Sequence, residues 1–393
     1  MVDAQVLAEL TEVEHPDILS VSLDVDPTKP EHQTPNPAYR IWAHEAIREI
    51  LAGLSDAARA KAARAAREVL AHLEKGPVPG RGVMIFAGPG VWHVFVLPFP
   101  LPRRVQYGYP DVFPVLWAMS EYTAYATVIV RKGYARIVVT YLGGTVAVDE
   151  ETLELDTSDW RFKAGRPDTY VRRVGIGVGR GAQADAFDAR VDEQYRRFWR
   201  QVAQATAHAL AGLHVERVIL GGPEEATAAL RPLLPAEVQR RIIGLVPIPV
   251  HATLADIRDR TLPLALAEHH RRESGLVATV VARTADGRGT SGRAATLGAL
   301  SQGAVETLIA DRDLAGDIWA CRRCAYGSAT SVAVCPFCGR TIEPLPLRQA
   351  LPVMALRHGA GLELVGPPAA AGLPEGVGAL LRYTPAPAAR GQA

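Results

Sequence analysis

Four cysteines carry the clearest chemical signal in this 393-residue chain. They form two Cys-x-x-Cys pairs with ten residues between them: Cys321 and Cys324, then Cys335 and Cys338. Each pair makes a short turn that points two thiolates at one ion, and four thiolates complete the tetrahedral shell of zinc. A closed shell leaves no position for substrate water, so we expect a structural zinc ion in a small ribbon over about 319–342. A ribbon whose ligands no longer hold a metal is the alternative.

The composition is that of an ordinary globular protein. With 48% hydrophobic and 22% charged residues, a largely disordered chain is excluded. The N-terminal sequence MVDAQVLAELTEVEHPD has acids where a signal peptide needs an apolar stretch, and no run approaches the roughly 18 apolar residues of a membrane span. We therefore expect a cytoplasmic protein without disulfides or a membrane partner. Lysine plus arginine (43) nearly equals aspartate plus glutamate (42), so any nucleic-acid-binding surface must be local.

One such local surface is predicted between residues 161 and 200. This stretch has ten basic residues against five acidic ones. Residues 159–180 show no hydrophobic periodicity, so we interpret them as a long loop leading into a helix. A positive segment of this kind is typical of an arm that contacts RNA phosphates, although a solvated loop and helix face have the same composition. The predicted RNA-binding residues of this basic arm are Arg161, Lys163, Arg166, Arg172, Arg173 and Arg180.

The elements that must position these groups begin with an N-terminal α/β unit. Residues 18–24 are rich in β-branched side chains and predict a strand, and helical patterns follow over 39–54 and 55–74. Gly88-Pro89-Gly90 divides an apolar stretch over 83–97, which predicts a hairpin. The proline-rich residues 98–114 are expected to form a connection.

The remaining sequence predicts a second and a third unit. Strands are expected over 126–131, 135–142, 145–154, 215–220, 241–246 and 305–310, and helices over 184–213, 254–273 and 290–303. His269 and His270 lie among charged residues of one of these helices, which indicates a solvated polar face. The tail from Pro367 is rich in proline, alanine and glycine and is expected to be loose.

The sequence Gly179-Arg180-Gly181-Ala182-Gln183, followed by ADAFDAR, resembles the Gly-Arg-Gly-Gly-Gln loop and helix of the archaeal and eukaryotic class 1 peptide chain release factors. The likeness continues in consistent order over about residues 122–345. RVILGGPEE (217–225) is similar to a strand and turn of that family, and TLGALSQGAVETLI (296–309) to a helix and strand of its third domain. A zinc ribbon at this position also fits archaeal members. By this resemblance the chain is identified as a bacterial homologue, in the broad sense that includes ribosome rescue and hibernation factors.

The resemblance implies an α/β fold with a three-domain release-factor-like architecture. The expected domains are an N-terminal α/β domain (1–118), a middle domain with the Gly-Ala-Gln loop (119–250), and a C-terminal domain with the inserted zinc ribbon (251–393). In the family, the middle domain mimics the acceptor arm of a tRNA and places its loop in the peptidyl transferase centre. The third domain contacts a translational GTPase. The resemblance thus implies the ribosome as partner, through its RNA and its A site, with a translational GTPase as a further candidate.

Departures from the family motif bear on the activity. The second glycine of Gly-Gly-Gln is Ala182, and the Asn-Ile-Lys-Ser tetrapeptide and cysteine motif that read stop codons are missing. We therefore expect a factor of the hibernation type that occupies the A site with weak or no hydrolysis. Gln183 and the intact Gly-Arg-Gly keep open the alternative of a peptidyl-tRNA-hydrolysing release or rescue factor, in which Gly181, Ala182 and Gln183 are the candidate catalytic residues. A third alternative is an RNA-binding protein that acts away from the ribosome.

Overall fold

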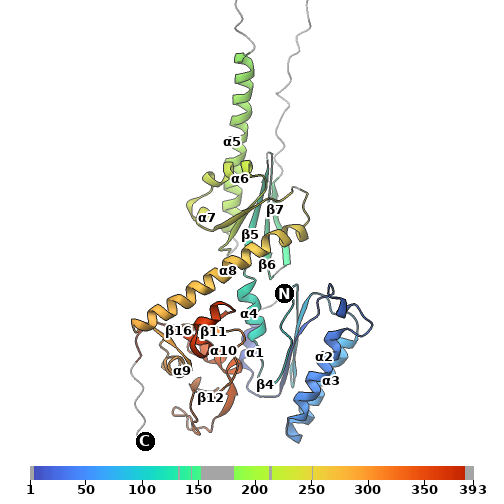
Figure 1. Ribbon diagram of the computed structural model, residues 1–393, viewed down its shortest axis with the longest axis vertical. Coiled ribbons are helices and arrows are strands. Elements are labelled where there is room, and N and C mark those ends of the chain that lie inside the picture. The colour runs from blue at the N-terminus through green and yellow to red at the C-terminus, as the bar shows by residue number, and fades with distance from the viewer. Residues whose placement is uncertain are drawn as a thin grey trace, which may run out of the picture. The chain divides into compact units, whose positions relative to one another are not determined.

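The computed structural model describes residues 4–131, 133–142, 144–151, 181–211, 215–249 and 251–385. The chain divides into two compact units, one formed by residues 1–123 together with 267–393 and the other by residues 124–266 (Figure 1). Both units combine helices and strands, so the predicted α/β class is confirmed. The division into three domains at residues 118 and 250 stays a prediction.

The N-terminal part of the first unit is an antiparallel sheet covered by two helices. The strand order is β3-β2-β1-β4, and the residues of β1 that alternate toward the helices, such as Leu19, Val21 and Leu23, are fully buried. The expected strand, helices and hairpin are all confirmed. Their bounds are β1 Ile18–Asp24, β2 Gly82–Gly88, β3 Val91–Leu97, α2 Ala38–Ala52 and α3 Asp56–Glu74, preceded by α1 Ala4–Glu12.

The expectation of a bare connection over 98–114 is wrong. It contains β4 (Arg104–Gly108), which pairs with the edge of β1, and the start of α4 (Phe113–Glu121). Only Val105 and Tyr107 alternate toward the core within this short strand, and prolines lie on both sides of it. Five residues are too few for a periodic pattern, so the pairing partner in β1 decides the conformation.

The C-terminal part of the first unit is a second sheet with the order β10-β16-β11-β15. Its strands are β10 Gly289–Ser291, β11 Val305–Asp311, β15 Gly361–Val365 and β16 Val377–Leu381, and its helices are α9 Arg293–Ser301 and α10 Leu347–Arg357. Between β11 and α10 lies a small three-stranded sheet with the order β13-β12-β14. It is formed by β12 Asp317–Cys321, β13 Tyr326–Ser328 and β14 Glu343–Pro346.

The expectation of a loose tail from Pro367 is wrong for the residues described up to 385. Strand β16 lies inside the second sheet, where it pairs with both β10 and β11. Val377 and Ala379 are fully buried in it. Proline, alanine and glycine dominate the composition around the strand, so the short apolar run VGALL gives no separate signal.

The second unit, residues 124–266, is built on a five-stranded sheet with the order β7-β6-β5-β8-β9. Strands β5 to β7 form an antiparallel meander, while β5, β8 and β9 are parallel. The strands are β5 Tyr125–Arg131, β6 Tyr134–Tyr141, β7 Gly144–Glu151, β8 Val218–Gly221 and β9 Ile242–Val246. The helices are α5 Gly181–Ala211, α6 Glu224–Leu230, α7 Ala236–Arg240 and the first part of α8 Leu254–Ala285.

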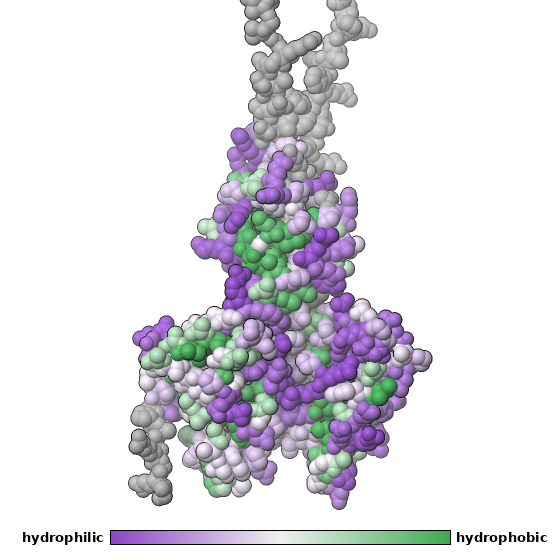
Figure 2. All heavy atoms as spheres, viewed as in Figure 1, coloured by the Kyte–Doolittle hydropathy of each residue, from purple (hydrophilic) through white to green (hydrophobic). Residues whose placement is uncertain are grey.

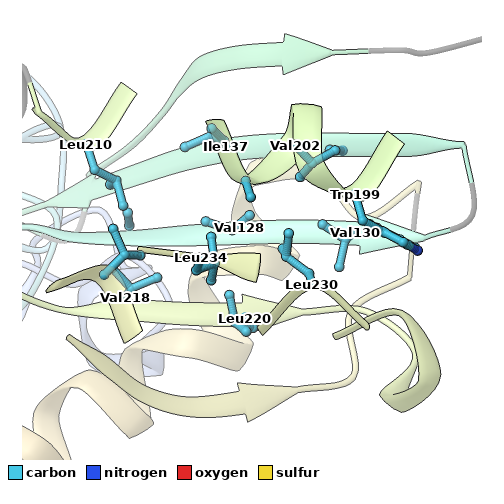
Figure 3. Packing of buried hydrophobic residues seen from close by; sticks show 14 of the residues in the cluster. Val128, Val130, Ile137, Trp199, Val202, Leu210, Val218, Leu220, Leu230 and Leu234 are labelled. Carbon is cyan, nitrogen blue, oxygen red and sulfur yellow. The ribbon is translucent and has the colours of Figure 1, made fainter. Parts of the chain in front are cut away.

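Strand β5 shows why this sheet is buried on both faces. Val128 and Val130 point toward α5, where Trp199 and Val202 pack on them (Figure 3). Tyr125 and other alternate residues face the opposite side, against the first turns of α8. Every residue from Tyr125 to Val130 is therefore buried, which explains the continuous apolar run in the sequence.

Helix α5 is much longer than the sheet that it covers. Tyr195, at the margin of the core, follows Gly181 by fourteen residues, so the helix carries Gly181 about 21 Å further along its axis. Figure 1 shows this end of α5 extending beyond the strands of its own unit.

Hydrophilic and weakly polar residues make up most of the visible face of both units (Figure 2). Among the described residues, no helix combines the length and the apolar character needed to span a membrane.

Candidate functional site

The four cysteines are brought together by the small β13-β12-β14 sheet. Cys321 ends β12, Cys324 stands in the turn before β13, and Cys335 and Cys338 come from the loop between β13 and β14. One sulfur from each cysteine lies within 4.8 Å of the other three. Cys321 and Cys335 are buried, and the other two are partly exposed. The predicted juxtaposition of these four thiols is therefore present.

Backbone geometry fixes the second Cys-x-x-Cys turn. The backbone N–H of Cys335 donates to the carbonyl of Arg340 at 2.8 Å, and the N–H of Gly339 donates to the carbonyl of Cys335 at 3.0 Å. Gly339 has φ +70°, and nothing lies within 4 Å of the position that a Cβ would take. Glycine is favoured here by its backbone conformation and not by lack of space.

The thiols differ in how readily they lose their protons. Burial raises the pKa of Cys321, and the hydrogen bond with Cys338 raises the pKa of Cys324 to about 12. The backbone N–H of Arg340 is the main cause that lowers the pKa of Cys338 to about 7. A metal cation favours the thiolate form of all four.

The spacing of the sulfurs fits a tetrahedral zinc ion. Zinc–sulfur bonds of about 2.3 Å give sulfur–sulfur edges of about 3.8 Å in a tetrahedron. The Sγ atoms of Cys321 and Cys338 are 3.7 Å apart. Trp319, Tyr326 and Ile342 pack around the cluster and limit its access to water. The four thiols and the distances between their sulfur atoms are thus compatible with the structural zinc that the sequence predicts.

Arg322, next to the first cysteine, anchors the ribbon to the start of the chain. Its Nη2 donates to the carbonyls of Thr11 at 2.9 Å and Val13 at 3.0 Å, and its Nη1 donates to that of Gln349 at 3.1 Å. The guanidinium also lies over the Tyr109 ring at 3.9 Å, and burial lowers its pKa to about 10. These contacts hold the ribbon in the first unit beside a cavity of about 730 Å³.

The Gly-Ala-Gln motif forms the first residues of α5 instead of a loop before it. The helix starts at Gly181, three residues earlier than expected. Alanine has the highest helix propensity, whereas glycine costs about 1 kcal/mol in a helix. Ala182, in place of the second glycine, thus favours extension of the helix into the motif. The side chains of residues 181–192 are not part of the structural description.

The basic arm falls outside the described residues. This holds for Arg161, Lys163, Arg166, Arg172, Arg173 and Arg180. The long helix that follows the arm is present, and three of its arginines surround one acid. Arg196, Arg197 and Arg200 each approach a carboxylate oxygen of Glu193 within 3.9 Å. Part of the positive charge predicted for this region is therefore balanced locally.

The interpretation of His269 as part of a solvated face is wrong. Its residue exposure is 8%, and its Nε2 lies 3.3 Å from Oε1 of Glu273, one turn further along α8. Glu121 of α4 joins these two residues in a buried cluster. The i, i+4 spacing of His269 and Glu273 is a usable sequence signal, but Glu121 lies almost 150 positions away in the chain. The proximity of Glu121 to His269 and Glu273 therefore could not be predicted from the sequence.

Residues 110–266 match the profile of the bacterial archaeo-eukaryotic release factors, family 10. This segment of the chain is similar to that family. The match includes the sheet of the second unit, the basic arm, the Gly-Ala-Gln motif and helix α5. The predicted relationship to the archaeal and eukaryotic-type release factors is thus confirmed. A search among curated proteins finds no match for the chain.

Solved structures of translation factors also align with the chain, at low similarity. An archaeal translation termination factor shares 16% identity over 97% of both chains, with a TM-score of 0.27. The Pelota protein of Archaeoglobus fulgidus shares 14% identity over 66% of this chain and 65% of its own, with a TM-score of 0.33. An archaeal Pelota from a ribosome-bound model with ABCE1 shares 15% identity over 79% and 74%, with a TM-score of 0.38.

Proposed function

We propose that this chain is a release-factor-like protein that binds the ribosomal A site in the cytoplasm with weak or no hydrolysis of peptidyl-tRNA. The observation that carries the proposal is the family match over residues 110–266, which includes the Gly-Ala-Gln motif. The basic arm supplies positive charge directly before the motif, where it can contact ribosomal RNA phosphates. A translational GTPase is a candidate partner for delivery.

The position of the motif on α5 supports this function. Helix α5 carries Gly181 well beyond the core of its unit, as a group that must enter a deep site requires. The first N–H groups of a helix have no partner within the helix, so they remain available to an oxyanion or a phosphate. Ala182 adds a methyl group beside this end, and it restricts the backbone angles that a second glycine would allow.

We also infer that Cys321, Cys324, Cys335 and Cys338 hold one structural zinc ion. The tetrahedral spacing of their sulfurs supports this proposal. The ion would replace the hydrophobic core that a ribbon of this size is too small to build. A complete shell of four thiolates gives it no open position for catalysis. Its role would be to hold the ribbon in one conformation.

Binding to RNA through the arm makes ribosome affinity dependent on salt. Replacing Arg172, Arg173 and Arg180 together by alanine removes three potential phosphate contacts. The slope of log affinity against log salt should therefore become shallower by about two to three units. Pelleting with purified ribosomes over a series of salt concentrations measures this slope.

A charge-matched control uses three exposed arginines of α3: Arg59, Arg64 and Arg67. Their replacement by alanine removes the same net charge and should leave the slope at the wild-type value. Equal slopes for wild-type protein and the arm variant would contradict an RNA-binding arm. Equal flattening in both variants would indicate unspecific attraction by net charge.

The proposed lack of hydrolysis is tested at Ala182. If this position needs φ above zero on the ribosome, alanine costs about 1 to 2 kcal/mol there, which corresponds to about 5- to 30-fold in rate. The Ala182→Gly variant should accordingly release peptide from ribosomes with labelled peptidyl-tRNA at least about fivefold faster than the wild type. The assay compares empty A sites with A sites that contain a stop codon.

The matched control adds Gln183→Ala to the Ala182→Gly background and should reduce release again. Rapid release by the wild type, without improvement in Ala182→Gly, would overturn the proposal.

A hydrolytic release or rescue factor is the second candidate function, and the retained Gln183 favours it. In its reaction, water adds to the ester carbonyl, the bond to the tRNA ribose oxygen breaks, and that oxygen takes up a proton. The Gln183 amide would orient the water and stabilise the developing charge.

A further inference from the structure

A buried cluster of one histidine and two glutamates lies in the first unit and shares no residue with the cysteine cluster. Glu121 comes from the last turn of α4, and His269 and Glu273 share one face of α8 because they are four residues apart. One ligand atom from each of the three lies within 4.8 Å of the other two. All three residues are buried, with exposures of 6%, 8% and 4% respectively.

Several neighbours fix the orientation of the two carboxylates. The indole N–H of Trp117 donates to Oε2 of Glu121 at 2.9 Å, and Nε2 of His270 lies 3.0 Å from Oε1 of the same residue. The backbone N–H of Gly366 donates to Oε1 of Glu273 at 3.2 Å. Each of the two carboxylates thus accepts at least one hydrogen bond from a group that is not part of the cluster. Such outer contacts are typical of carboxylates that ligate metals.

Two shielded polar atoms in the cluster make no hydrogen bond. They are Oε2 of Glu273 and Nε2 of His269, although the latter lies at ion-pair distance, 3.3 Å, from Oε1 of Glu273. A polar atom that makes no hydrogen bond in the interior destabilises the fold, and more so when the group is charged. A cation bound by both atoms would remove this cost for both groups at once.

The charge balance also favours a cation. Two carboxylates converge here, and the arginine that pairs with the cluster is Arg312, whose Nη1 lies 3.8 Å from Oε2 of Glu121. Arg312 is partly exposed and also approaches Asp313 at 3.5 Å. Arg312 thus divides its charge between Glu121 and Asp313, whereas the contact of Glu273 is with the imidazole of His269, at 3.3 Å.

We propose that Glu121, His269 and Glu273 bind one divalent cation of the manganese or zinc class. Imidazole and carboxylate ligands suit these ions, whereas the thiolates of the ribbon favour zinc over manganese. Three ligands leave further positions to water. The cation joins α4 to α8, and through the Gly366 contact it also orders the loop after β15. Its role is structural, and it does not depend on the ribosomal function proposed above.

Manganese is the probe that separates this site from the cysteine cluster. The full-length protein is dialysed against a chelator, given one equivalent of zinc for its thiolates, and titrated with Mn²⁺ while electron paramagnetic resonance reports the free ion. We expect one bound Mn²⁺ per chain and a melting temperature that rises with Mn²⁺ concentration. The Glu273→Gln and His269→Gln variants should each weaken binding by at least about tenfold.

The matched control is Glu268→Gln, on the same helix, where the glutamate pairs with the exposed Arg271 instead of the cluster. It should bind Mn²⁺ as the wild type does. Absence of both Mn²⁺ binding and thermal stabilisation in the wild type would overturn the proposal without recourse to any variant. Undiminished binding in a folded Glu273→Gln variant would overturn it too, because the ion would then lie elsewhere.

Discussion

Replacing Cys335 by serine is expected to abolish zinc binding by the ribbon. Cys335 is the most deeply buried of the four thiols, and a serine hydroxyl does not replace a thiolate in a tetrahedral four-sulfur shell. Structural zinc sites contribute about 10 to 16 kcal/mol of apparent binding free energy in small peptides, so the ribbon should lose its order with the ion. Elemental analysis should show a fall from one zinc per chain to none. Hydrogen exchange should become fast over residues 319–342.

The control for this prediction is the neighbouring Val334, which is 52% exposed. Val334→Ser changes the same loop without touching the sulfurs and should keep both the zinc and the exchange protection. The sheet of residues 124–266 should remain protected in both variants. Wild-type protein that contains no zinc after purification without chelators, yet protects residues 319–342, would contradict the proposed metal.

Loss of the carboxylate of Asp111 should destabilise the first unit by about 3 to 5 kcal/mol, the usual cost of breaking a buried ion pair. Asp111 and Arg348 are 1% and 5% exposed, and Nε of the arginine lies 3.3 Å from both carboxylate oxygens. Asp111→Asn keeps the shape of the side chain but leaves the buried guanidinium without its counter-charge. Urea unfolding at neutral pH measures the change in the free energy of unfolding.

Two further variants separate this ion pair from other effects. Asp313→Asn removes a 62% exposed carboxylate near Arg312 and should change the stability by less than about 1 kcal/mol. The double variant Asp111→Leu, Arg348→Met should recover most of the loss, because well-packed apolar residues can replace a buried pair. A loss for Asp111→Asn no greater than that for Asp313→Asn would show that the pair contributes little.

The sequence predicted elements whose signal is local. Strand β1 and the β2–β3 hairpin have continuous apolar runs and a glycine turn, and the four cysteines have the spacing of a zinc ribbon. Strands β4 and β16 were missed because each is five residues long and depends on partners far away in the chain. Helix α5 begins three residues before the predicted start, because the glycines of the Gly-Arg-Gly sequence indicate a loop whereas Ala182 has a high helix propensity.

The buried cluster on α8 shows the same limit for functional residues. His269 stands in a run of charged side chains that is typical of a solvated helix face, and its i, i+4 spacing to Glu273 is the local signal that the sequence offers. Its neighbour Glu121 and the loop at Gly366, which contacts Glu273, are distant in sequence. The predictions for the arm and for the Gly-Ala-Gln side chains lie outside the described residues and stay predictions.

The unit of residues 124–266 interrupts the unit formed by residues 1–123 and 267–393. Within the interrupted unit, the two flanks of this insertion are adjacent, since Nε2 of His270 and Oε1 of Glu121 are 3.0 Å apart. Insertions are best tolerated where the entry and exit of the host lie close together. The two ends of the inserted unit therefore leave the host side by side, although helix α8 (Leu254–Ala285) continues from the insertion into the host. The first unit thus closes on itself without residues 124–266, and the insertion can vary in sequence without separating the two halves of its host.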